Sequence, residues 1–134
     1  MPHISTEDRD PCPRCSNPAR HYFGEQSHGP RLHQFEGWNC PSCGLVSEAD
    51  GYLPEELRER LLVKFGRFSV FILTEDRPRL LAAFRQLTTL PLQDVYALAR
   101  RMPGAYERGL TQPQATALAE RVSSTGLLAE VRSD

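Results

Sequence analysis

The chain has 134 residues, of which 40% are hydrophobic and 25% are charged, and its formal net charge is -1. This length suits one ordinary domain or two small ones, and the composition is typical of a soluble globular protein. The near-neutral charge argues against a global positive field that would bind nucleic acid regardless of sequence. The chain has no apolar run of about 18 residues, so we expect no membrane span.

The first ten residues, M-P-H-I-S-T-E-D-R-D, are polar and acidic. They lack the hydrophobic segment of a signal peptide. We therefore expect residues 1–10 to form a flexible tail. Without an export signal, we expect the protein to be cytoplasmic, where reduced C-x-x-C pairs usually hold a metal instead of forming disulfides.

The four cysteines form two C-x-x-C pairs separated by 24 residues: Cys12, Cys15, Cys40 and Cys43. Four soft thiolates in two tight turns predict one Zn²⁺ ion, and Gly44 suits the positive φ that such a turn often needs. The pattern is typical of a zinc ribbon, which we place at residues 11–50. Four cysteines leave no open coordination position, so we expect the zinc to be structural.

A second set of ligands is conceivable, in which two histidines complete a DNA-binding finger, Cys12-x2-Cys15-x12-His28-x4-His33. That finger needs both histidines on one helix, and Gly29 and Pro30 disfavour a helix between them. It would also leave the second cysteine pair without a role. We therefore expect His21, His28 and His33 to be surface residues.

The ribbon also holds four aromatic residues that could stack nucleic-acid bases: Tyr22, Phe23, Phe35 and Trp38. In so small a module, aromatic residues more often form the core. Residues 11–51 carry more acidic than basic side chains, so they form no basic patch. We expect a strand from Leu32 to Trp38 that enters the second cysteine pair, and another that begins at Leu45.

A linker helix is predicted within residues 51–67. Pro54 is tolerated in a first helical turn, and Glu55 and Glu56 suit the positive end of the helix dipole. Leucines recur at helical spacing, and Gly66 ends the pattern.

The remaining residues, 68–134, predict the order strand, helix, helix, strand, helix, strand. The expected segments are 68–73, 77–87, 92–101, 105–109, 111–125 and 127–132. Thr111 and Gln114 match the capping box at the start of a helix. The fold class is therefore α+β: a small zinc ribbon followed by a β-α-α-β-α-β domain with helices on one face of an antiparallel sheet.

Several segments of this second half match a known pattern: T-L-P-L (89–92), Q-D-V-Y (93–96), Pro103, G-L-T-Q-P-Q-A (109–115) and G-L-L-A-E-V (126–131). Through them, residues 68–132 resemble the C-terminal domain of the bacterial ribosomal stalk protein, which recruits translational GTPases. The stalk protein is anchored by an N-terminal helical dimerisation segment and a hinge. This chain has a zinc ribbon there, so we do not expect it to be a stalk subunit.

The resemblance implies a factor-docking face on the first two helices of the domain. Arg77, Leu81 and Arg85 match that face, while Tyr96 stands where the family usually has Lys. It also implies a non-enzymatic protein-binding adaptor, with a translational GTPase or the ribosome as its partner.

Other functions stay open from the sequence. The ribbon could serve a nucleic-acid-binding accessory protein, and the second half could bind a dedicated partner. The stalk-like fold also resembles the Clp protease adaptor, whose N-D-D cluster is matched only in part by Thr74-Glu75-Asp76. We see no Ser/His/Asp set, phosphate loop or open metal site, so we expect no enzymatic activity.

Overall fold

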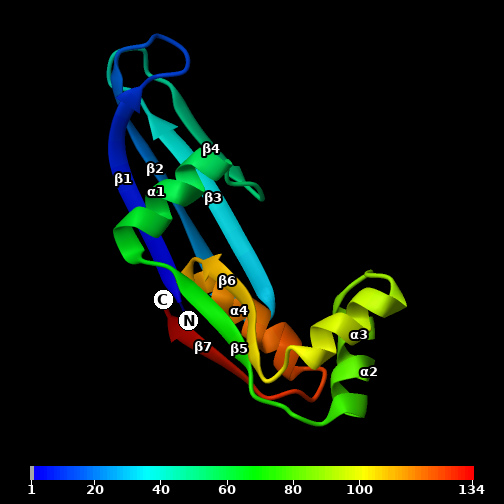
Figure 1. Ribbon diagram of the computed structural model, residues 1–134. Coiled ribbons are helices and arrows are strands. Elements are labelled where there is room, and N and C mark those ends of the chain that lie inside the picture. The colour runs from blue at the N-terminus through cyan, green and yellow to red at the C-terminus, as the bar shows by residue number, and fades with distance from the viewer. Residues whose placement is uncertain (1) are drawn as a thin grey trace.

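The computed structural model describes residues 2–134, which form two antiparallel sheets and four helices (Figure 1). The strands are β1 (His3–Pro11), β2 (Pro18–His28), β3 (Arg31–Asn39), β4 (Val46–Asp50), β5 (Phe68–Ile72), β6 (Gly104–Leu110) and β7 (Ala129–Ser133). The helices are α1 (Glu55–Phe65), α2 (Arg77–Leu87), α3 (Leu92–Arg100) and α4 (Gln112–Ser123). The prediction of a mixed α+β chain with antiparallel pairing is confirmed. Of the described helices, none combines the length and apolarity needed to cross a membrane.

The first sheet has the strand order β1-β2-β3-β4, with every pair antiparallel. Strands β2 and β3 form a long hairpin in which His28 pairs with Arg31 around a two-residue turn. Gly29 occupies that turn with φ 60°, a conformation that glycine adopts without strain. Since His28 and His33 lie on strands, the helix that a two-Cys, two-His finger requires is absent from residues 18–39.

The expectation of a flexible tail at residues 1–10 is wrong, because residues His3–Pro11 form strand β1 and pair with β2 along their whole length. Ile4 and Thr6 are buried, and every second residue of β1 faces the protein interior. The sequence analysis did not predict the strand, because most side chains in residues 1–10 are polar. The inward carboxylates Asp8 and Asp10 are tolerated because both form ion pairs with Arg60 of α1.

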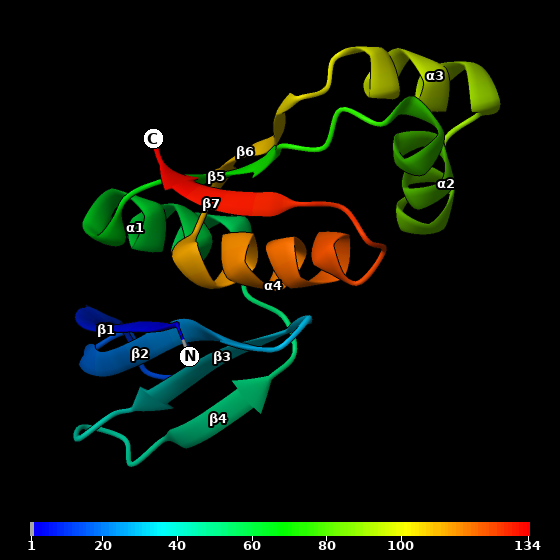
Figure 2. The same cartoon turned by 90° about the horizontal axis from the view of Figure 1, so that it is seen from below.

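The second sheet has the order β6-β5-β7, and α4 lies between the two sheets (Figure 2). Helix α1 covers the same face of the first sheet, with Leu57 and Leu61 packed against Phe23. Helices α2 and α3 lie at the far end of the second sheet. Their apolar sides form the main core with α4, centred on Phe84 and Leu80, which are both fully buried.

Glu25 of β2 joins the first sheet to α4. Its side chain is completely buried, and its two oxygens accept hydrogen bonds from Thr111 at 2.5 Å, Gln34 at 2.5 Å and Gln114 at 3.2 Å. Thr111 is also the N-cap of α4, and together with Gln114 it forms the predicted capping box. A buried carboxylate therefore sits at the positive end of the α4 dipole, where it is satisfied by three donors.

Replacement of Glu25 by Ala is expected to lower the free energy of unfolding by about 3 kcal/mol, because three buried donors lose their acceptor. Urea denaturation followed by circular dichroism measures this loss. Glu120→Ala, at an exposed position of α4, is the matched control and should stay within about 0.5 kcal/mol of the wild type. A Glu25→Ala protein as stable as this control would contradict the role given to the buried carboxylate.

Candidate metal centre and partner-binding face

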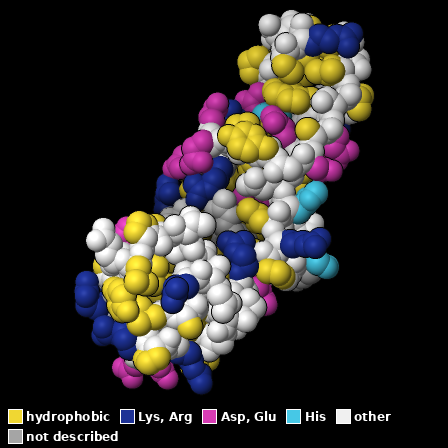
Figure 3. Space-filling view, turned by 90° about the vertical axis from the view of Figure 1, so that its right-hand side faces the viewer, with side chains coloured by type: hydrophobic (Ala, Val, Ile, Leu, Met, Phe, Trp, Pro, Cys, Tyr) yellow, Lys and Arg dark blue, Asp and Glu magenta, His cyan; other side chains and the backbone are white. Residues whose placement is uncertain are grey.

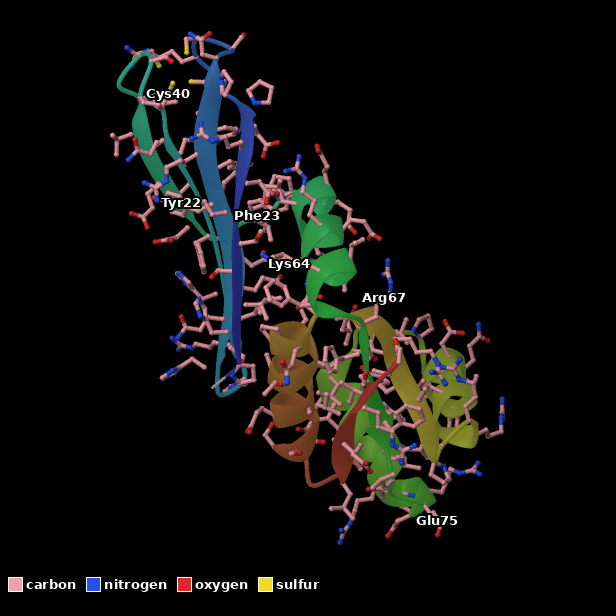
Figure 4. The ribbon with its side chains drawn as sticks, turned by 90° about the vertical axis from the view of Figure 1, so that its left-hand side faces the viewer. Tyr22, Phe23, Cys40, Lys64, Arg67 and Glu75 are labelled. Carbon is pink, nitrogen blue, oxygen red and sulfur yellow. The ribbon has the colours of Figure 1, made fainter. Side chains whose placement is uncertain are left out.

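The two cysteine pairs lie at the end of the first sheet that is distant from the second sheet, where Cys40 is labelled in Figure 4. Each pair forms the same turn. In the first turn, the N–H of Ser16 donates to the carbonyl of Cys12 at 2.9 Å. In the second turn, the N–H of Gly44 donates to the carbonyl of Cys40, also at 2.9 Å. The N–H of each first cysteine in turn donates to the carbonyl five positions ahead, at 2.8 and 2.9 Å. The two turns are therefore equivalent, as two knuckles that hold one ion should be.

The residue directly after the second cysteine of each turn has positive φ, 78° at Gly44 and 68° at Ser16. Glycine adopts this conformation freely, as the sequence suggested for Gly44. Ser16 is the only non-glycine residue with positive φ in the described chain. The sequence around Cys12 and Cys15 does not predict a left-handed conformation at Ser16, because serine rarely adopts positive φ. The structure shows it because the first turn has the same hydrogen bonds as the second.

The four sulfur atoms lie within 4.8 Å of one another, so these cysteines could hold a metal ion. The Sγ atoms of Cys12 and Cys43 are 3.7 Å apart, and those of Cys15 and Cys40 are 3.6 Å apart. Tetrahedral bonds of about 2.3 Å to one ion separate neighbouring sulfurs by about 3.8 Å. The sulfur positions therefore fit a closed site with four thiolate ligands.

Backbone N–H groups favour the ionised form of part of this cluster. The N–H of Cys43 donates to the Cys40 sulfur and, against the opposing effect of burial, lowers the pKa of Cys40 to about 6. The N–H of Leu45 lowers the pKa of Cys43, but burial and the sulfurs of Cys15 and Cys40 outweigh it and raise that pKa to about 11. Four crowded thiols oppose complete ionisation unless a cation compensates their charge.

A shell of apolar and stacked side chains separates the cysteines from the rest of the sheet. Ala19 is buried beside Cys12 and Cys40, and Trp38 packs against the same cluster. The indole ring of Trp38 stacks on His21, with the ring centroids 3.8 Å apart and the planes inclined by 8°. The cysteine cluster is therefore in contact with the interior of the first sheet.

His21 is buried, which contradicts the expectation of a surface residue. Its Nδ1 lies 2.8 Å from an oxygen of Asp10, and its Nε2 lies 2.6 Å from an oxygen of Glu36. Each ring nitrogen of His21 therefore lies within hydrogen-bond distance of a different carboxylate. Asp10 also accepts from Arg60 at 2.8 Å, and that guanidinium, helped by His21, lowers the pKa of the Asp10 carboxyl below its usual value.

Sequence reasoning missed this cluster because its members lie on β1, β2, β3 and α1. One signal was available: the alternation of Ile4, Thr6, Asp8 and Asp10 has the period of a strand with one inward face.

The four residues expected to bind a partner lie on α2 and α3. Arg77, Leu81 and Arg85 are four residues apart and form one stripe along α2. Arg77 and Arg85 are exposed, whereas Leu81 packs in part against the main core. Arg85 and Leu92 line the same hollow of about 220 Å³, and Tyr96, which is 44% exposed, lies one turn beyond Leu92 on α3. We call these five residues the α2–α3 face.

Comparison with protein-family models, with curated proteins and with solved structures found no match to this chain.

If the four cysteines hold a metal ion, its removal by a chelator is expected to shift the emission of Trp38, the only tryptophan, to longer wavelength, because the packing of Trp38 against the cysteine cluster is lost. The free energy of unfolding should fall by about 2.7 kcal/mol relative to protein with free metal at about 100 times its Kd. The helical circular dichroism signal serves as a control and should persist, since α2, α3 and α4 share a separate core. Elemental analysis verifies that the metal has been removed. If the emission of Trp38 is then unchanged, the expected contact between Trp38 and the metal-bound cysteine cluster is contradicted.

Replacement of Arg60 by Gln is expected to lower the free energy of unfolding by about 1 kcal/mol near neutral pH. Because the folded pKa of Asp10 is lowered, the stabilisation is present above about pH 4 and is lost as the pH falls through the folded value. The difference between wild type and variant in urea denaturation should therefore shrink as the pH falls below about 4.

Arg108→Gln provides the control, because the Arg108 guanidinium lies over the Phe71 ring and has no carboxylate partner among residues 2–134. Its effect should not change over the same pH range. A difference between wild type and Arg60→Gln that stays constant at every acidic pH at which both proteins are folded would contradict the role given to Asp10.

Proposed function

We propose that this protein is a non-enzymatic adaptor that binds a protein partner through the α2–α3 face and contains one structural zinc ion. The observation that carries the proposal is the exposure of basic and apolar side chains together on that face. In Figure 3, which views the molecule from the side of α2 and α3, hydrophobic side chains gather on the lower lobe and Lys and Arg side chains border them.

The zinc assignment rests on the chemistry of the ligands. Four thiolates at tetrahedral spacing select a soft or borderline ion, and Zn²⁺ is the ordinary choice in a reducing compartment. With four protein ligands, no position is left for a reacting water, so the ion has a structural role and the cysteine-bearing sheet acts as a zinc ribbon. A cytoplasmic location agrees with four thiols kept reduced.

The domain assignment rests on the order of elements. From β5 to β7, the chain runs strand, helix, helix, strand, helix, strand, which is the order of the stalk C-terminal domain that residues 68–132 resemble. The resemblance implies that the partner is a translational GTPase or the ribosome.

Local charge supports the same class of partner. Residues 77–101 contain five arginines and one acidic residue, Asp94, although the whole chain carries a net charge of -1. The helices therefore present a local positive surface, which would steer an acidic partner towards the exposed apolar side chains. Leu90, Leu92 and Tyr96 supply those side chains, with exposed fractions of 48%, 53% and 44%.

The protease-adaptor alternative is weaker because two of the three residues of its partial motif, Thr74 and Asp76, have structural roles. Asp76 caps α2 by accepting from the N–H of Arg79, and the Thr74 hydroxyl accepts from the N–H of Leu128. Neither group is aimed at an external amine. The nucleic-acid alternative concerns the first sheet and is independent of the α2–α3 face.

The test is affinity capture from native bacterial lysate, followed by titration of the captured translational GTPase or ribosomal protein. The double variant Arg77→Glu/Arg85→Glu should weaken the Kd by at least about 10-fold, because two favourable charges become repulsive. Arg9→Glu changes an exposed arginine of β1 and is the matched control, with an unchanged Kd. Elemental analysis of the same protein should find one zinc per chain. Capture that recovers no translation factor and no ribosomal protein would refute the translational form of the proposal.

A further inference from the structure

The first sheet has two different faces. Its inner face contacts α1 and α4, which both lie on the same side of the sheet (Figure 2). Tyr22 and Phe23 are neighbours on β2 and point to opposite sides, Phe23 towards α1 and Tyr22 away from it (Figure 4). The outer face, on the side of Tyr22, has no helix over it within residues 2–134 (Figure 2).

Two aromatic rings lie across the backbone of this outer face. A Cβ added to Gly37 would lie 2.0 Å from Cζ of Tyr22, and one added to Gly24 would lie 2.6 Å from Cζ of Phe35. Each ring therefore covers a glycine on the neighbouring strand, and any larger residue at that glycine would displace the ring. Both aromatic residues are only partly buried, so each ring keeps solvent-exposed surface.

The two rings belong to one continuous surface. Tyr22 pairs with Gly37 and Gly24 pairs with Phe35, so Tyr22 and Phe35 occupy diagonal positions on adjacent strands, about 7–8 Å apart at their Cα atoms. The imidazole of His3 stacks on Phe35, with centroids 6.0 Å apart and planes inclined by 24°. His3, Tyr22 and Phe35 also border one open hollow of about 670 Å³.

On the outer face, the central strands and the edge strands carry different charged residues. The central strands β2 and β3 place no acidic residue on the outer face; their outward positions are Arg20, Tyr22, Gly24, Gln26, His28, Arg31, His33, Phe35, Gly37 and Asn39. Their acidic residues, Glu25 and Glu36, point inward and are bound by Thr111 and His21. The outward acids occur only on the edge strands. A track with an arginine near each end and aromatic rings between them therefore runs along β2 and β3.

We propose that this track binds single-stranded nucleic acid, with bases stacked on Tyr22 and Phe35 and phosphates bound by Arg20 and Arg31. Exposed rings on an open antiparallel sheet offer stacking surfaces that any unpaired base can use. Arg20 is held in place by Glu7, whose carboxylate accepts from its Nε and Nη2, and its Nη1 is left for an anion. Duplexes are excluded because their bases are stacked on each other.

The length of the track limits the site. Residues 20 to 28 of β2 span about 26 Å at about 3.3 Å per residue, which accommodates a few extended nucleotides. With few phosphate contacts, the affinity should be modest and should depend weakly on salt. This inference does not depend on the α2–α3 face, so either proposal can fail alone.

Fluorescence anisotropy with labelled oligo(U) RNA and oligo(dT) DNA of about eight nucleotides at about 50 mM salt tests the proposal. Tyr22→Leu and Phe35→Leu keep each glycine covered but remove the stacking ring. Each should weaken the Kd by about 5- to 150-fold. Tyr52→Leu changes a tyrosine that is 75% exposed outside the track and is the matched control, with an unchanged Kd. Circular dichroism and metal content verify that each variant is folded.

Arg31→Ala should weaken RNA and DNA binding alike and reduce the slope of log K against log salt by about 0.7. Binding of RNA alone, or of DNA alone, would assign the ligand to one of the two nucleic acids and support the site. The proposal is overturned if the wild-type protein binds neither oligonucleotide, if a duplex of equal length binds equally well, or if folded Tyr22→Leu and Phe35→Leu bind like Tyr52→Leu.

Discussion

The buried carboxylate of Glu25 is the interaction on which the arrangement of the two sheets depends. It lies on the central strand β2 and binds the N-cap residue of α4, so that one side chain joins the first sheet to the helix that supports the second. A carboxylate without partners could not remain at this depth, because its desolvation would cost several kcal/mol. Thr111, Gln34 and Gln114 together remove that penalty, and the first sheet is therefore a packed part of the fold and not a separate tethered module.

The first sheet uses the alternation of its strands to separate charges. Inward acids on β1, β2 and β3 meet His21, Arg60 and the cap of α4, while the outward positions of β2 and β3 carry only basic, neutral and aromatic side chains. At one end of this sheet the two cysteine turns lie close together, and beside them the stack of Trp38 on His21 joins β3 to β2. The cysteine cluster and the inner polar cluster thus contact the same set of strands.

Local patterns predicted a large part of the structure. The capping box of Thr111 and Gln114, the extent of α2 and the stop of α1 at Gly66 agree with expectation, because each depends on residues within one or two helical turns. The four possible metal ligands followed from cysteine spacing alone. The expectations for residues 1–10 and for His21 were wrong, since polar side chains in a buried strand depend on partners from distant segments. The stalk resemblance, the partner and the α2–α3 face stay predictions.

The sequence by itself determined the helices, the cysteine turns and the α+β class, because hydrophobic periodicity, caps and spacing act over short distances along the chain. Only the tertiary structure decided that β1 is a strand, that Glu25 of the first sheet binds the N-cap residue of α4 and that Tyr22 and Phe35 share an uncovered face. These features arise from pairing between residues far apart in the sequence, such as Thr111 and Glu25, which are 86 positions apart. Such pairing has no local signal, because its free energy appears only when the whole chain has folded.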